Sequence, residues 1–306
     1  MSGKYCLFSI LIMGIMNLPC QAQQKNSLEH LKEKISERLA AEKGFFAIAF
    51  KDLQTGETIF QNEHSLFHPA STMKTPVMVE AFKEAAENEL SFSDSILLKN
   101  EFMSIADSSF FSLDSTNDSE KDLYQHLGEK RSISQLLYKM ITISSNFSTN
   151  LLVEKLGASR ITETMHDLGL GEMQVLRGVE DNKAYDKGLN SVTTAYDLML
   201  LFENLGNGQL VSAQASAEMI RILEDQRFNE IIPAELPLRV KVAHKTGSFP
   251  GVHHDSGLVI LPDGRKYVLV LLSKDLKDEK SATRAMADIS AMIYKYVHRQ
   301  KHAMHY

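Results

Sequence analysis

Residues 257–272 read GLVILPDGRKYVLVLL, two continuous apolar runs separated by a short turn sequence. Short runs rich in Val, Leu and Ile and bounded by turn residues favour buried strands. Pro262, Asp263 and Gly264 supply that turn chemistry between the runs. The stretch therefore predicts a β-hairpin whose strands lie inside a sheet.

Further strands are expected on both sides of a long polar and helical middle. An apolar run at residues 45–50 and a shorter one at 58–60 flank a turn, and residues 238–243 alternate between apolar and polar side chains. Amphipathic patterns at residues 27–43 and 279–297 predict the first and last helices.

This order of elements indicates the fold class. We expect an α/β (α+β) protein with a mixed five-stranded antiparallel sheet, terminal helices on one face and an all-helical lobe inserted on the other. The single domain would span residues 23–306, with an α/β lobe at about 23–66 and 225–306 and a helical lobe at about 67–224. Within that helical lobe, residues 104–127 are polar and predict a long loop with one short helix.

Composition narrows the class of protein. The chain has 306 residues, of which 43% are hydrophobic and 24% charged, with a formal net charge of −6. These values exclude a disordered or collagen-like chain. The acidic balance argues against a nucleic-acid partner, since a general binder needs a basic face. We expect a monomer.

The N-terminus predicts export. Lys4 precedes an apolar run at residues 6–18, and a cleavage site ends near Ala22, as in a secretory signal peptide spanning residues 1–22. The run is short for a membrane span, so we expect a secreted or periplasmic protein without stable membrane insertion. An uncleaved anchor, or a lipoprotein cleaved before Cys20, are the alternatives. Cleavage near Ala22 would remove both cysteines of the chain, Cys6 and Cys20.

The first candidate for chemistry is the pair Ser71 and Lys74. On a helix, residues three apart lie on one face, so the amine can reach the hydroxyl. A serine nucleophile needs an adjacent base, and a buried lysine whose pKa falls can supply one. The alternative is a helix start with an exposed lysine.

Two further motifs follow along the chain. Ser144 and Asn146 lie on either side of one residue. Ser144 could relay a proton and Asn146 could bind a substrate amide. Alternatively, Ser144 could simply cap a helix. The third motif is Lys245-Thr246-Gly247, which could place an ammonium, a hydroxyl and bare backbone along a cleft. Alternatively, it is an ordinary passage from a strand into a turn.

Together the three motifs, in this order, resemble the class A β-lactamase family and its related penicillin-binding serine hydrolases. Asn150-Leu151-Leu152 follows Asn146 as in that family, and Arg177 and Thr193-Thr194 lie where its Ω-loop begins and ends. The likeness covers essentially the whole chain after residue 22.

The resemblance implies a role for each motif. Ser71 would be the acylated nucleophile, Lys74 its proton acceptor and Ser144 the relay to the leaving nitrogen. Lys245 and Thr246 would hold the substrate carboxylate. The backbone amides of Ser71 and Ser248 would form the oxyanion hole. The resemblance implies no cofactor and no metal, and we expect His253-His254-Asp255 and the tail histidines His298, His302 and His305 to be solvated surface.

The Ω-loop departs from the family pattern. Class A enzymes carry a glutamate there that activates the deacylating water and is closely followed by Leu-Asn. Here Glu180 is the best candidate, but it lies one residue late from Arg177, and Leu189-Asn190 comes much later. Glu180 could equally be a structural carboxylate that pairs with Arg177 or Lys183. The second motif also has Ser145 where the family usually has aspartate.

These departures leave three functions open. The chain resembles a serine β-lactamase that hydrolyses the β-lactam amide through a Ser71 acyl-enzyme. Without an efficient Glu180, it would be a D-alanyl-D-alanine peptidase-like or other serine hydrolase that deacylates slowly. A non-catalytic β-lactam-binding sensor domain is the third possibility. The expected partner is a small-molecule β-lactam or a cell-wall peptide.

Overall fold

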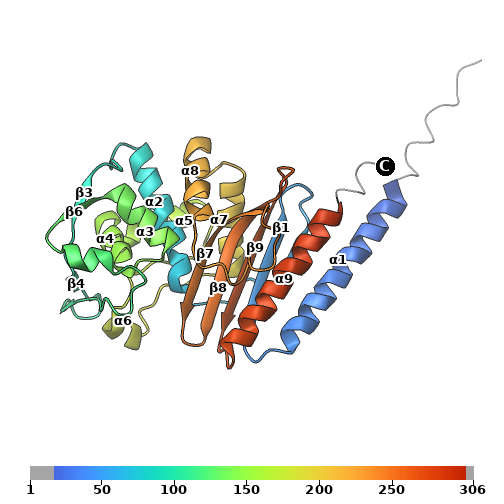
Figure 1. Ribbon diagram of the computed structural model, residues 1–306, viewed down its shortest axis with the longest axis horizontal. Helices are drawn as coiled ribbons and strands as arrows, with labels where there is room; N and C mark the ends of the chain where they lie inside the picture. Colours follow the sequence, from blue (N-terminus) through green and yellow to red (C-terminus); the bar gives the residue numbers. More distant parts are fainter. Residues whose placement is uncertain (1–16, 301–306) are drawn as a thin grey trace, which may run out of the picture.

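The computed structural model describes residues 17–300 and has a five-stranded sheet at its centre (Figure 1). The strand order is β2-β1-β9-β8-β7, and every neighbouring pair is antiparallel. The strands are β1 (Phe45–Asp52), β2 (Thr58–Gln61), β7 (Lys241–Phe249), β8 (Val252–Ile260) and β9 (Lys266–Lys274). The predicted hairpin at residues 257–272 is therefore the β8–β9 pair, closed by a turn in which Gly264 has a positive φ of 87°.

The central strand β9 explains why its sequence is continuously apolar. Alternate side chains of a strand point to opposite faces, so a strand covered on both faces needs apolar residues throughout. Val268, Val270 and Leu272 pack into the core of the helical lobe. Tyr267, Leu269 and Leu271 pack into the core beneath the terminal helices.

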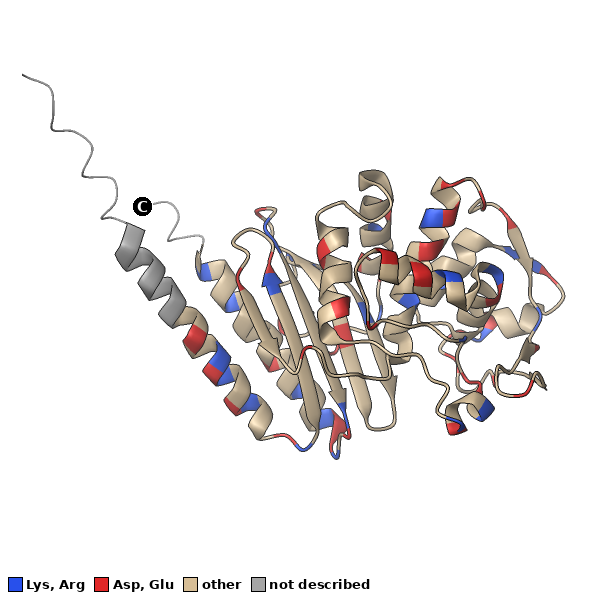
Figure 2. Ribbon diagram, turned by 180° about the vertical axis from the view of Figure 1, so that it is seen from behind, with Lys and Arg blue, Asp and Glu red and all other residues tan. Residues whose placement is uncertain are grey.

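The two terminal helices cover one face of the sheet. Helices α1 (Asn17–Ala40) and α9 (Glu279–Gln300) lie side by side along it (Figure 1). Leu31, Ile35 and Leu39 of α1 join Ile289 and Ile293 of α9 in the same buried cluster. Figure 2 shows charged residues mainly on helices and loops and few on the central strands, as two-sided burial requires.

The helical lobe lies against the other face. Its helices are α2 (Lys74–Ala86), α3 (Ile133–Thr142), α4 (Asn146–Leu156), α5 (Ala158–Asp167), α6 (Asn182–Asp186), α7 (Ala195–Gly206) and α8 (Ala213–Glu224). Two short 3-10 helices, η1 (Ala70–Met73) and η2 (Asp122–His126), and the strands β3 (Ser95–Leu97), β4 (Phe102–Met103), β5 (Phe110–Phe111) and β6 (Lys130–Ser132) complete it. Helix α7 lies directly on the sheet, in contact with β1, β8 and β9.

The predicted fold class is confirmed, with differences at element ends. The strand expected at residues 238–243 begins at Lys241, because Val240 donates to the Pro237 carbonyl in a turn and Leu238 is fully exposed. The first helix begins at Asn17 and ends at Ala40 rather than spanning 27–43. The polar loop contains η2, as expected, but also β5, which pairs with β4 just before the loop.

Part of the predicted signal peptide, residues 1–16, lies outside the described residues, as do His302 and His305. Within residues 17–300, no helix is both long and apolar enough to cross a membrane.

Candidate active site

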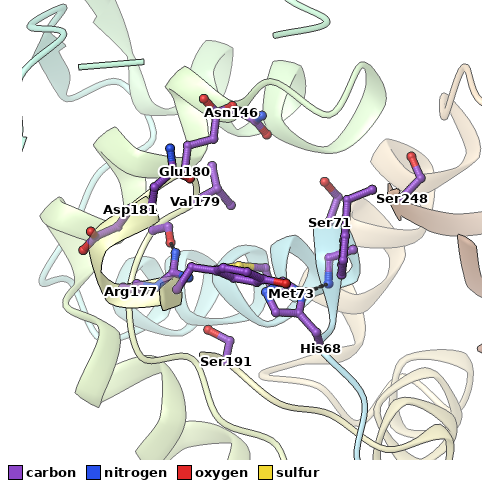
Figure 3. A pocket seen from close by; sticks show the side chains of 15 residues that line it. His68, Ser71, Met73, Asn146, Arg177, Val179, Glu180, Asp181, Ser191 and Ser248 are labelled. Atoms are coloured by element: carbon purple, nitrogen blue, oxygen red, sulfur yellow. Dashed lines mark hydrogen bonds between the residues drawn. The ribbon is translucent and has the colours of Figure 1, made fainter. Parts of the chain in front are cut away.

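A cavity of about 260 Å³ lies where the helical lobe meets the sheet. Its walls come from η1, the start of α4, the Ω-loop (residues 177–194) and the end of β7. Ser71 and Ser248 border one end, and Asn146 and Glu180 lie across from His68 and Ser191 (Figure 3). The structure therefore brings residues from all three sequence motifs to one place.

Ser71 belongs to η1, and Lys74 begins α2 directly after it, so the two residues lie about one helical turn apart. The Lys74 side chain is fully buried, and its Nζ donates to the Ser144 carbonyl (2.6 Å) and Asn146 Oδ1 (2.8 Å). Burial lowers its pKa to about 7. The exposed-lysine alternative is therefore wrong, and a neutral amine is available near pH 7.

Ser144 connects the two motif lysines. Its Oγ accepts from Lys74 Nζ (3.2 Å) and from Lys245 Nζ (3.0 Å). Its backbone has a positive φ of 57°, an uncommon conformation for a non-glycine residue. The helix-cap alternative is wrong for Ser144, because Ser145 caps α4 by accepting from the Ser148 amide.

Asn146 lies between Lys74 and Glu180. Its Oδ1 accepts from Lys74, while its Nδ2 donates to Glu180 Oε1 at 2.6 Å. Burial raises the pKa of Glu180, and the hydrogen bond from Asn146 opposes that rise. Glu180 itself has a positive φ of 61°.

The ion-pair alternative for Glu180 is wrong. Lys183 pairs with Asp107 (3.0 Å), and Arg177 binds Asn190 Oδ1 (2.8 Å) and the carbonyls of Leu189 and Gly178. Glu180 lines the cavity instead.

Strand β7 carries the third motif along the other wall. Lys245 is fully buried, and burial followed by the nearby Lys74 charge lowers its pKa well below the usual value. Thr246 is buried beside it, whereas Ser248 is exposed and lines the cavity. A Cβ on Gly247 would lie 2.9 Å from the Ser71 amide nitrogen, so the chain itself, rather than a substrate, approaches this glycine closely.

The Ω-loop is fixed by an amide clamp. Asn150 Oδ1 accepts from the Val179 amide (2.6 Å), and its Nδ2 donates to the Val179 carbonyl (3.0 Å). Gly178 gives the Asn150 side chain room, because a Cβ there would lie 2.3 Å from Asn150 Oδ1. This clamp holds the backbone of the Ω-loop at Val179, the residue directly before Glu180.

Sequence reasoning missed Asp118, a residue of the polar loop whose buried side chain contacts the N-terminus of α4. Its carboxylate accepts from the amides of Asn146 (3.1 Å) and Phe147 (2.8 Å) and from the Tyr124 hydroxyl (2.9 Å). A carboxylate therefore does reach this motif, although Ser145 replaces the usual aspartate. No sequence pattern singles out Asp118, because it is one of several acidic residues in a polar loop.

His68, Tyr185 and Phe249 were also missed. All three line the cavity, and the His68 ring contacts Phe249 (centroids 4.9 Å) and Tyr185 (6.0 Å). His68 precedes Ser71 by three residues, which was the only available hint.

The prediction that His253-His254-Asp255 is solvated surface is wrong. His254 and Asp255 are fully buried in β8. His254 bonds the His68 carbonyl (3.0 Å) and the Ser273 amide (3.1 Å), and Asp255 pairs with His244 (2.8 Å). Across residues 17–300, no three potential ligands are grouped so as to hold a metal ion.

This chain is similar to known proteins in sequence and in fold. A curated β-lactamase of Bacteroides uniformis is 22% identical over 90% of this chain and 92% of its own. A β-lactamase structure from Chitinophaga pinensis has a TM-score of 0.77 at 20% identity, covering 88% of this chain and 99% of that one. The structure of PBP-A has a TM-score of 0.75 at 23% identity, covering 88% and 96%.

These neighbours show that the fold is β-lactamase/transpeptidase-like. The model of the beta-lactamase enzyme family matches residues 30–297, which include every motif of the site. This chain belongs to the beta-lactamase enzyme family.

Proposed function

We propose that this protein is a serine β-lactamase that hydrolyses the β-lactam amide through an acyl-enzyme on Ser71. The observation that carries the proposal is the chain of hydrogen bonds from Lys74 to Ser144, Asn146 and Glu180 around a cavity lined by Ser71. Family membership and the similarly folded β-lactamases support the same activity.

In acylation, the Ser71 hydroxyl attacks the β-lactam carbonyl carbon and gives its proton to neutral Lys74. The Ser71 and Ser248 amides stabilise the oxyanion. As the carbon–nitrogen bond breaks, a proton passes from Lys74 through the Ser144 hydroxyl to the leaving nitrogen. Lys245 and Thr246 bind the substrate carboxylate, since both lie on β7 and Lys245 donates to the Ser144 hydroxyl.

In deacylation, a water attacks the ester carbon, and Glu180 takes its proton. The Ser71 oxygen leaves and regains a proton, so the product is the ring-opened acid. Burial raises the pKa of Glu180, which makes its carboxylate a stronger base than an exposed one.

One observation favours a second candidate. The Leu-Asn pair of this chain, Leu189-Asn190, lies near the end of the Ω-loop rather than directly after Glu180. There Asn190 accepts a hydrogen bond from Arg177. If Glu180 cannot hold the water, the protein would be a penicillin-trapping hydrolase of the D-alanyl-D-alanine peptidase type or, without any turnover, a β-lactam sensor.

Ring opening distinguishes these functions. We expect excess benzylpenicillin to be consumed over many turnovers, as followed by absorbance. A single equivalent consumed per protein would favour the trapping hydrolase, and no consumption would contradict both.

Export belongs to the same proposal. We propose that the leader is cleaved near Ala22 and that the protein acts outside the cytoplasm as a monomer. N-terminal sequencing of the protein from cell fractions, and its mass by light scattering, test these points.

A further inference from the structure

A buried cation borders the cavity without a carboxylate partner. Arg177 is 8% exposed and forms no ion pair within residues 17–300; the Asp181 charge acts on it only from beyond ion-pair distance and partly offsets the lowering of its pKa by burial. Its three bonds go to two carbonyls and to the neutral Asn190 side chain. A guanidinium has five N–H donors and stays charged, so two donors remain without an acceptor in the described chain. Buried charges are ordinarily paired.

Two further donors line the same side of the cavity. His68 Nδ1 accepts from the Ala70 amide (3.1 Å), so the proton of the neutral ring is on Nε2. Burial and the Arg177 charge lower the pKa of His68 to about 4, which keeps the ring neutral at pH 7. Ser191 Oγ accepts from the Leu176 amide (3.2 Å), which leaves its hydroxyl hydrogen to donate.

The carboxylates that line this cavity are engaged elsewhere. Asp181 accepts from Ser104 Oγ and from the amides of Ile105 and Ala184, and it is turned away from the cavity (Figure 3). Glu180 accepts from Asn146, on the side opposite His68 (Figure 3). The wall formed by Arg177, His68 and Ser191 therefore presents donors, one of them charged.

We propose that Arg177, His68 and Ser191 form an anion subsite that binds a carboxylate on the acyl arm of the substrate. The inference rests on the proposed function, because it places the acyl arm relative to Ser71. With the scissile carbonyl at Ser71 and one carboxylate near Lys245, the acyl arm lies in this cavity, between the end of β7 and the Ω-loop. The preferred substrates then carry a second carboxylate, on the acyl side.

Two penicillins that differ by one carboxylate test the subsite. Carbenicillin is benzylpenicillin with a carboxylate added on the acyl arm. We expect the acylation rate constant kcat/KM at pH 7 to be at least about fivefold higher for carbenicillin. The neutral-arm drug serves as an internal control, because any general damage to the site affects both rates.

His68 variants supply matched controls. His68→Asn retains an acceptor for the Ala70 amide but loses the Nε2 donor, and we expect it to lower the carbenicillin preference about tenfold, the effect of one charge-assisted hydrogen bond. His68→Gln can still place a donor in the cavity and should stay within about threefold of wild type. Ser191→Ala should lower the preference by a smaller factor.

The outcomes separate the two claims. A wild-type preference at or below one, or a preference that His68→Asn leaves within twofold, overturns the subsite while acylation by benzylpenicillin upholds the proposed function. If neither drug acylates Ser71, the proposed function fails, and titration with the side-chain fragments decides the subsite. Tighter binding of phenylmalonamate than of phenylacetamide supports it, and equal binding overturns it.

Discussion

At the scale of single residues, the site depends on one hydroxyl placed between two lysines. Ser144 Oγ lies 3.2 Å from Lys74 Nζ and 3.0 Å from Lys245 Nζ, and both amines are fully buried. Two like charges this close, away from water, disfavour each other. The two amines are therefore disfavoured from both carrying a charge, and burial lowers the pKa of each, which makes a neutral Lys74 available as a base.

This arrangement predicts a pH dependence for acylation. Because burial lowers the pKa of Lys74 to about 7, the neutral amine forms as pH rises through 7. We expect acylation by benzylpenicillin to rise about tenfold per pH unit below 7 and to level off above it. Stopped-flow rates between pH 5 and 8 measure this, and a flat profile would exclude Lys74 as the base.

Glu180 should act only after acylation. We expect Glu180→Gln to be acylated at a rate within about threefold of wild type but to deacylate at least about 100-fold more slowly, the usual contribution of a general base. Acyl-enzyme accumulation by mass spectrometry measures both steps. Asp186→Asn, an exposed carboxyl in the same loop, is the matched control and should behave as wild type. Unchanged deacylation in Glu180→Gln would assign Glu180 a structural role.

At the scale of elements, the start of α4 positions the second motif. Asp118 accepts from two amides at this helix N-terminus, where a carboxylate is electrostatically favoured. The same helix carries Asn146 toward Lys74 and Asn150 toward the Ω-loop. A change at Asp118 should therefore affect both stability and chemistry.

We expect Asp118→Ala to lower the free energy of unfolding by about 3 kcal/mol, because two buried amides of α4 and the Tyr124 hydroxyl would lose their hydrogen-bond acceptor. Acylation should also slow, since Asn146 loses its support. Urea denaturation gives the stability. Asp114→Asn, an exposed aspartate in the same loop, should change it by less than about 0.5 kcal/mol. A loss below 1 kcal/mol in Asp118→Ala would contradict this role.

At the scale of the whole molecule, the site exists only where the two lobes meet. Strand β7 of the sheet lies against η1 of the helical lobe, and Gly247 is the point of close approach. An added Cβ there would lie 2.9–3.0 Å from the Ser71 amide, Ala70 Cβ and the Pro69 carbonyl, mostly rigid backbone.

Gly247→Ala should therefore separate the lobes locally and widen the oxyanion hole. We expect acylation to fall at least about 100-fold, comparable to losing an oxyanion donor. Gly171→Ala is the matched control, because a Cβ there has nothing within 4 Å, and it should acylate normally. Near-wild-type acylation in Gly247→Ala would show that the contact can relax without disturbing the site.

The sequence predicted the parts of the fold that local patterns determine. The apolar runs of β8 and β9 and the three motifs were readable because each is contiguous or at helical spacing. His68 and Arg177 could not be predicted as parts of the cavity, nor Asp118 as the partner of α4, because tertiary folding alone brings them there. The prediction that His254 and Asp255 are solvated was wrong, since their polar side chains are buried with partners on other segments, namely the His68 carbonyl, His244 of β7 and the Ser273 amide of β9.

The most direct test of the account is the intact mass of the protein after mixing with benzylpenicillin. We predict a transient adduct with the mass of the whole drug, located on Ser71 by peptide mapping and absent in Ser71→Ala. Retention of the adduct in Ser71→Ala, or its location on another residue, would contradict the central claim that Ser71 is the nucleophile.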